Sequence, residues 1–145
     1  MDFEVEAAHS GRRPARFGTA LGVAVAALAV GLVAAPVASA TATRVGADAD
    51  INYGLGTNYG TGCQYTVEVS VTDPVQPVHI FDNGASIGWF RPNGGQAVAP
   101  WTPATVGNHR LTAVQTGTPA GAPTPYVNVR VGTGTHIGTS CAVTG

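Results

Sequence analysis

The sequence contains no lysine and few charged residues of any kind. All seven basic residues are arginines, charged residues make up 10% of the chain, and the formal net charge is −1. Typical soluble domains have roughly 25% charged residues. Surfaces that attract nucleic acid or an anionic membrane carry an excess of positive charge. The composition therefore argues against nucleic acid as a partner and against electrostatic binding to membranes.

Strong helix-forming segments are also lacking after the first third of the chain. The 145 residues include 20 glycines and 10 prolines, and both residue types destabilise helix interiors. A chain of this length has room for one domain and a targeting segment.

The first 40 residues have the pattern of an export signal. Three arginines precede an uncharged, alanine- and valine-rich run over residues 17–33, and the segment ends on Ala-Ser-Ala. Signal peptidases require small side chains at these last positions. We predict cleavage between Ala40 and Thr41, which leaves residues 41–145 as the mature domain.

Two alternatives stay open for this segment. The apolar run is at the short limit of what spans a bilayer, so a retained anchor is the competing interpretation. The Arg12-Arg13 pair leaves the twin-arginine route open beside the general secretory route. No cysteine lies at the cleavage site, so a lipoprotein anchor is not predicted, and the mature domain contains no predicted membrane span.

Cysteine is scarce, and its even count is informative. Only Cys63 and Cys141 are present, and in an exported chain such a pair favours a disulfide. Closing a loop of about 79 residues stabilises a fold by roughly 4–5 kcal/mol in the chain-entropy model. Two cysteines are too few for a zinc site, and no histidine lies at ligand spacing to either. We therefore predict a disulfide, no bound metal and no cofactor.

Alternating apolar and polar residues predict short strands in the mature domain. This period of two is typical of half-buried strands, and it occurs over residues 65–71, 109–115 and 126–131. Asn83-Gly84 predicts a tight hairpin, and residues 92–95 predict a second hairpin turn.

These strands predict the fold class. With an edge strand from residues 41–51, about seven short strands follow one another with turns every ~10 residues, and no helix is expected after residue 40. The sequence therefore predicts an all-β, immunoglobulin-like antiparallel β-sandwich.

The stretch from Pro77 to Gln115 resembles bacterial Ig-like repeat domains, in particular a small secreted actinobacterial form. The similar segments are residues 78–84, 86–88, 95–97 and 101–114, with flanks at residues 62–67 and 131–141. The resemblance implies an Ig-like fold and a non-enzymatic role, since such modules usually act as spacers or adhesion modules in cell-surface proteins. It also implies a structural role for His109.

The mature domain has few residues that could form a catalytic site. Serine catalysis needs a nucleophile, a base and an orienting acid. The mature domain has no strand-to-helix elbow of the G-x-S-x-G type, because the match at residues 84–88 follows a predicted hairpin turn and no helix is expected there. Its serines and histidines are scattered over separate segments: Ser70, Ser86, Ser140, His79, His109 and His136. We predict that the protein is not an enzyme.

Acidic residues do not complete a metal or glycosidase site either. Asp48, Asp50 and Asn52 have the spacing of a calcium loop, but its glycine and its closing acid fall on Tyr53 and Tyr59. Asp73 and Asp82 are explained as turn residues, which leaves no convincing pair of catalytic carboxylates.

Aromatic residues are the best candidates for ligand contact. Trp89 and Phe90 are adjacent on one predicted strand, so if one faces the core the other faces solvent. Tyr53 and Tyr59 lie in a Gly- and Asn-rich segment that can join such a surface, whereas Trp101 is expected in the core. An exposed aromatic side chain suits a protein partner or a sugar ring. We therefore expect a secreted binding or structural module at the cell envelope, with a protein or a glycan as its ligand.

Overall fold

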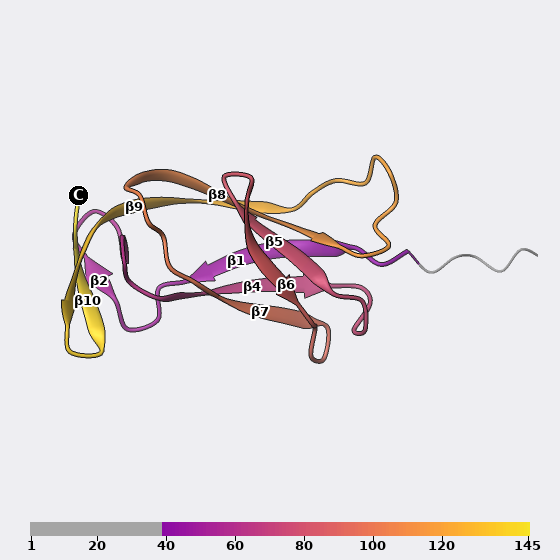
Figure 1. Cartoon of the computed structure of the whole chain (residues 1–145), viewed down its shortest axis with the longest axis horizontal. Helices are drawn as coiled ribbons and strands as arrows, with labels where there is room; N and C mark the ends of the chain where they lie inside the picture. The colour runs from indigo at the N-terminus through magenta and orange to yellow at the C-terminus, as the bar shows by residue number, and fades with distance from the viewer. Residues whose placement is uncertain (1–38) are drawn as a thin grey trace, which may run out of the picture. The chain divides into compact units, whose positions relative to one another are not determined.

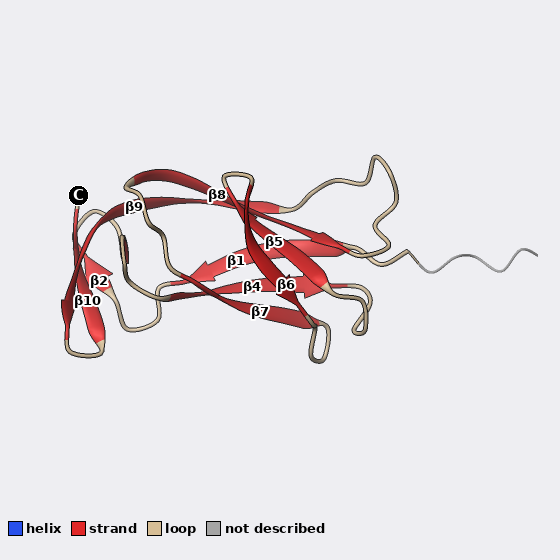
Figure 2. Cartoon of the chain, viewed as in Figure 1, coloured by secondary structure: helices blue, strands red, loops and turns tan. Residues whose placement is uncertain are grey.

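The structure is a computed structural model that describes residues 39–145. The export signal was predicted over residues 1–40, and its residues up to 38 lie outside the described residues. Every regular element in the described part is a β-strand (Figure 2). Within that part, no helix is long and apolar enough to cross a membrane.

The strands follow one another closely along the chain. They are β1 (Ala42–Asp48), β2 (Tyr53–Gly54), β3 (Tyr59–Gly60), β4 (Tyr65–Val71), β5 (Val78–Asp82), β6 (Ala85–Phe90), β7 (Gln96–Trp101), β8 (Gly107–Gln115), β9 (Tyr126–Ile137) and β10 (Ser140–Thr144).

Seven of the strands form a two-layer sandwich (Figure 1). One sheet has the order β1-β4-β7, and the other contains the run β9-β8-β5-β6, with every pair antiparallel. In the lettering of immunoglobulin domains these are A-B-E and G-F-C-C′. The predicted all-β, Ig-like sandwich is confirmed, and β1 lies at a sheet edge as expected for residues 41–51.

The alternation of side chains explains the two layers. Tyr65, Val67 and Val69 of β4 are fully buried, whereas Glu68 between them is exposed. In β5, β7 and β8 buried side chains alternate with more exposed ones in the same way. The buried ones complete the core: Val78, Ile80, Ala97, Ala99, Trp101, Leu111 and Ala113. Each strand thus contributes one apolar face to the interior.

The two predicted hairpin turns differ in outcome. Asn83 and Gly84 have φ angles of 48° and 84°, and they join the antiparallel pair β5 and β6 as predicted. The hairpin predicted at residues 92–95 is wrong in one respect. The chain turns there, with a bridge between Asn93 and Gln96, but β6 and β7 belong to different sheets and β7 pairs with β4. The turn residues specify a reversal of direction, and the choice of partner strand is made by packing.

Strand β9 is longer than the sandwich needs, and its second half supports an extension. Residues 133–137 of β9 pair with β10, while the short strands β2 and β3 add in parallel to β10 and β9. Figure 1 shows β2, β10 and the C-terminus together at one end of the described domain. The disulfide between Cys63 and Cys141 ties this extension to the segment that leads into β4, so the predicted bridge is present.

Candidate functional site

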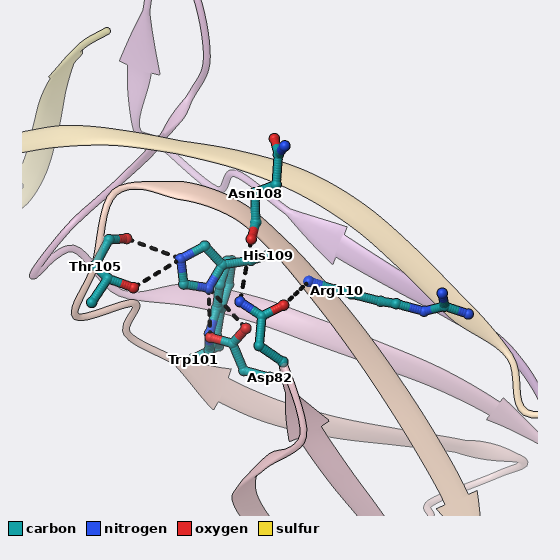
Figure 3. Close-up of polar contacts among 7 residues, drawn as sticks. Asp82, Trp101, Thr105, Asn108, His109 and Arg110 are labelled. Carbon is teal, nitrogen blue, oxygen red and sulfur yellow. Dashed lines mark hydrogen bonds and ion pairs between the residues drawn. The ribbon is translucent and has the colours of Figure 1, made fainter.

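A polar network links the two sheets around Asp82, at the end of β5 (Figure 3). Trp101 Nε1 donates to Asp82 Oδ2 at 2.9 Å, and His109 Nδ1 donates to the same carboxylate at 2.8 Å. On its other side, His109 Nε2 lies 2.9 Å from the carbonyl oxygen of Thr105 and 3.3 Å from its hydroxyl. Only 4% of His109 is exposed. The network therefore satisfies buried donors that would otherwise be unpaired.

The arrangement resembles a catalytic acid, base and hydroxyl in the order Asp82, His109 and Thr105. Its geometry nevertheless suits a structural role, in which hydrogen bonds hold the two sheets together. His109 Nε2 is closer to the carbonyl oxygen of Thr105, at 2.9 Å, than to its hydroxyl, at 3.3 Å. A general base also needs access to substrate, and His109 of β8 is buried with its ring packed edge-on against Trp101. The structural role expected for His109 agrees with this geometry.

The outward-facing residues of the β9-β8-β5-β6 sheet form the most distinctive surface. Trp89 is 60% exposed, while the neighbouring Phe90 packs against the core. Register pairs Trp89 with His79 and His79 with Val114, and the adjacent row aligns Phe81, Thr112 and Tyr126. We name this surface the outer-face patch and define it by Trp89, His79, Phe81, Val114, Tyr126 and Arg110.

Ring contacts fix the side chains of the outer-face patch. The His79 ring stacks on Trp89 with centroids 4.2 Å apart and lies 4.0 Å from Phe81. His79 Nε2 is also 2.7 Å from the hydroxyl of Ser86. At the other end of the patch, the Arg110 guanidinium lies 3.8 Å from the ring centre of Tyr126, which is a cation–π distance. These contacts hold the rings in place before any ligand arrives, which limits the entropy lost on binding.

The two tyrosines proposed for ligand contact lie elsewhere. Tyr53 is exposed on β2, whereas the Tyr59 ring packs against Tyr65 and Trp101 and its hydroxyl donates to the carbonyl of Ala47. The structure thus separates Tyr53, Tyr59 and Phe90 from the outer-face patch. Of the four aromatic candidates, only Trp89 belongs to it.

Burial affects the ionisation of two tyrosines. Burial is the main cause that raises the pKa of Tyr59, and the nearby Asp48, Tyr65 and Asp50 raise it further. Burial also raises the pKa of Tyr65, although the hydrogen bond from the Gly60 amide opposes this. Both hydroxyls are therefore kept as neutral donors or acceptors.

A groove of about 500 Å³ lies beside the patch, between β1 and the segment that leads into β9. Its walls are residues 41–45 and 122–126, so Tyr126 belongs to both the groove and the patch. Arg44 is its only charged residue, and strand β1 has a single partner in its sheet. The groove offers an unpaired strand edge next to the aromatic surface.

One prediction about the cysteines is wrong. From the spacing along the sequence we predicted no histidine ligand near Cys63 or Cys141, but the β9–β10 hairpin places His136 directly opposite Cys141. His136 Nδ1 lies 3.6 Å from Cys141 Sγ. Two residues five positions apart face each other across a tight hairpin. Gly138, the glycine at the turn, was the sequence feature that could have indicated this pairing.

Comparison with known proteins leaves the chain without an assigned family. No family model and no curated protein matches it. Among solved structures it is similar to the CARDB domain of a Pyrococcus furiosus protein, with 18% identity over 61% of this chain and 92% of that one, and a TM-score of 0.40. A fibronectin(III)-like module of Clostridium thermocellum CbhA matches at 20% identity over 55% and 87% of the two chains, with a TM-score of 0.38.

A third similar structure is the complex of the pro- and mature domains of Porphyromonas gingivalis RgpB. The identity is 21% over 62% of this chain and 19% of that one, and the TM-score is 0.35. The assignment of an Ig-like fold depends on the strand order described above.

Proposed function

We propose that this protein is an exported, non-enzymatic Ig-like module that binds a protein at the cell envelope through its outer-face patch. The observation that carries the proposal is one exposed sheet face that carries Trp89, Tyr126 and Arg110, with Trp89 stacked on His79 and Arg110 on Tyr126. Tryptophan, tyrosine and arginine are the residue types most enriched among energetically dominant interface residues.

The charge of this surface indicates the kind of partner. Arg110 and Arg130 are exposed on β8 and β9, while the one acid on the four strands of this sheet face, Asp82, is turned inward toward Trp101. The face is therefore positive, although the whole chain has a net charge of −1. A partner surface that carries carboxylates beside an apolar pocket would complement it.

Binding of the purified oxidised chain to envelope fractions of its own species tests the proposal. Trp89→Ala and Arg110→Ala are expected to weaken binding about tenfold or more, the effect of losing a dominant interface residue. Val98→Ala is the matched control, because Val98 is 52% exposed on the opposite sheet. Saturable binding that survives Trp89→Ala and Arg110→Ala, or that is lost equally in Val98→Ala, contradicts the proposal.

A glycan ligand is the second candidate, and one observation favours it. Trp89 lies on β6, the last strand of its sheet, so the ring face opposite His79 is not covered by a further strand. Sugar rings stack on such faces. The protein ligand is preferred because His79 already covers one face of Trp89 and Arg110 covers one face of Tyr126. A glycan array answers the question: a sugar that binds the parent chain and not Trp89→Ala supports the glycan.

Export is a proposal that stands on the signal pattern and the disulfide. The first strand begins at Ala42, two residues after the expected cleavage position. N-terminal sequencing of the chain recovered outside the cytoplasm is expected to begin at Thr41. Recovery of an exported chain that begins at Met1 would show instead that the segment is a retained anchor.

A further inference from the structure

Three metal-ligating side chains converge where the C-terminal extension meets the sandwich. Sγ of Cys63, Sγ of Cys141 and one ring nitrogen of His136 all lie within 4.8 Å of one another. Two of them come from facing positions of the β9–β10 hairpin, and Cys63 comes from the segment before β4. In the oxidised chain the sulfurs are bonded to each other, so the cluster holds a metal only after reduction.

The spacing of these atoms matches a tetrahedral zinc site. Zn–S bonds of about 2.3 Å and Zn–N bonds of about 2.0–2.1 Å at the tetrahedral angle place sulfur and nitrogen about 3.5 Å apart. His136 Nδ1 and Cys141 Sγ are 3.6 Å apart. The two sulfurs must separate to about 3.8 Å in such a site. Because the Cα atoms of Cys63 and Cys141 are 6.3 Å apart, side-chain rotation supplies this separation without moving the strands.

The surroundings of His136 prepare one ring nitrogen for coordination. His136 Nε2 lies 3.1 Å from the carbonyl oxygen of Gly62. A carbonyl only accepts, so Nε2 carries the proton and the lone pair is on Nδ1, which faces Cys141 Sγ. Metal-ligating histidines are held in this way by a backbone carbonyl on their second nitrogen. His136 is exposed whereas both cysteines are buried, so the ion enters from the side of the histidine.

We propose that the reduced chain binds one Zn²⁺ through Cys63 Sγ, Cys141 Sγ and His136 Nδ1, with water as the fourth ligand. A dithiol reductant supplies two electrons and two protons to the protein disulfide and becomes a disulfide itself. Zinc then displaces the two thiol protons and binds the two thiolates. The disulfide and the metal use the same sulfurs, so the two forms exclude each other. This site is independent of the proposed binding surface.

The experiment compares the reduced and oxidised full chain. The chain is reduced with a dithiol, freed of reductant without oxygen, and titrated with Zn²⁺ against a chromogenic chelator and with Co²⁺ as a spectroscopic probe. We expect one equivalent per reduced chain, thiolate-to-cobalt charge-transfer absorption, and no binding by the oxidised chain. His136→Ala is expected to weaken zinc binding about tenfold or more. Val98→Ala, which removes an exposed side chain outside both the cluster and the outer-face patch, is expected to leave zinc affinity unchanged.

Unfolding of the reduced chain does not make the test ambiguous. Zinc should then restore the strand signal in circular dichroism for the parent chain and fail to do so for His136→Ala, because metal binding and folding are coupled. Equal zinc affinity of the parent and His136→Ala overturns the proposal, as does a reduced chain that binds no zinc at one equivalent.

Discussion

Replacing Asp82 with alanine removes an acceptor that two buried donors share. Trp101 Nε1 and His109 Nδ1 both donate to this carboxylate, and the two residues are 3% and 4% exposed. The three side chains come from β5, β7 and β8, and therefore from both sheets. The substitution thus tests whether the network connects the two layers energetically.

The magnitude follows from the number of donors left without a partner. Each unsatisfied buried donor costs about 1–3 kcal/mol, so two donors place the loss between about 2 and 6 kcal/mol. The Asp82 side chain is 16% exposed, which lets water reach part of the vacated space. We therefore expect a loss of about 3 kcal/mol in the free energy of unfolding, a large share of the 5–15 kcal/mol typical of small domains.

Urea denaturation followed by tryptophan fluorescence measures this loss. Asp73→Ala is the matched control: it also removes one carboxylate, but that carboxylate accepts from the backbone amides of Val75 and Gln76 in a loop, and the Asp73 carbonyl that accepts from Gln115 Nε2 stays in place. Water replaces those bonds, so the control should lose less than about 1 kcal/mol. If Asp82→Ala loses no more than Asp73→Ala, the network does not stabilise the sandwich and the reasoning is refuted.

Three further predictions concern other parts of the fold. Cys141→Ser removes the bridge to Cys63, whose sequence separation is 78, and should lower the free energy of unfolding by about 4–5 kcal/mol; an unchanged denaturation midpoint would contradict this. Gly134→Ala should cost about 1–3 kcal/mol, because its Cβ would clash with Cys63 Sγ and with the Thr61 carbonyl oxygen, whereas Gly46→Ala meets nothing closer than 3.9 Å and should be nearly neutral. The folded-state pKa of Tyr59 is raised by burial, so its contribution is complete below the unfolded-state pKa of about 10 and is lost as pH rises further. Tyr59→Phe should therefore lose less stability than the parent chain between about pH 9 and 11, and identical pH profiles would count against this.

Much of the fold was predictable because the described domain is rich in strands with one buried face. Alternation at residues 65–71 and 109–115 determines which side chains enter the core, and the structure has this pattern in β4 and β8. Asn83 is a local signal of the same kind, since its positive φ angle is a property of the turn itself. Such features depend on neighbours in the sequence.

The features that were not predicted depend on contacts across the sheets. Trp89 was a candidate from its position, but the stacking of His79 on it and the place of Tyr126 in the same surface require the register of four strands. The sharing of Asp82 between Trp101 and His109 likewise joins residues that are 19 and 27 positions away. Interpreting Asp82 as a turn residue therefore missed its main role.

A photo-crosslinking side chain at position 114, inside the outer-face patch, shows which face of the sandwich touches the partner. Envelope material from the organism's own cells is incubated with the oxidised chain carrying the crosslinker in place of Val114, which is 38% exposed and leaves Trp89 and Arg110 intact, and with a second chain carrying it in place of Val98. We predict one discrete adduct from position 114, competed away by unlabelled parent chain and not by Arg110→Ala, and no such adduct from position 98. Equal adducts from both positions, or an adduct from position 98 alone, would contradict the claim that the β9-β8-β5-β6 face is the binding surface.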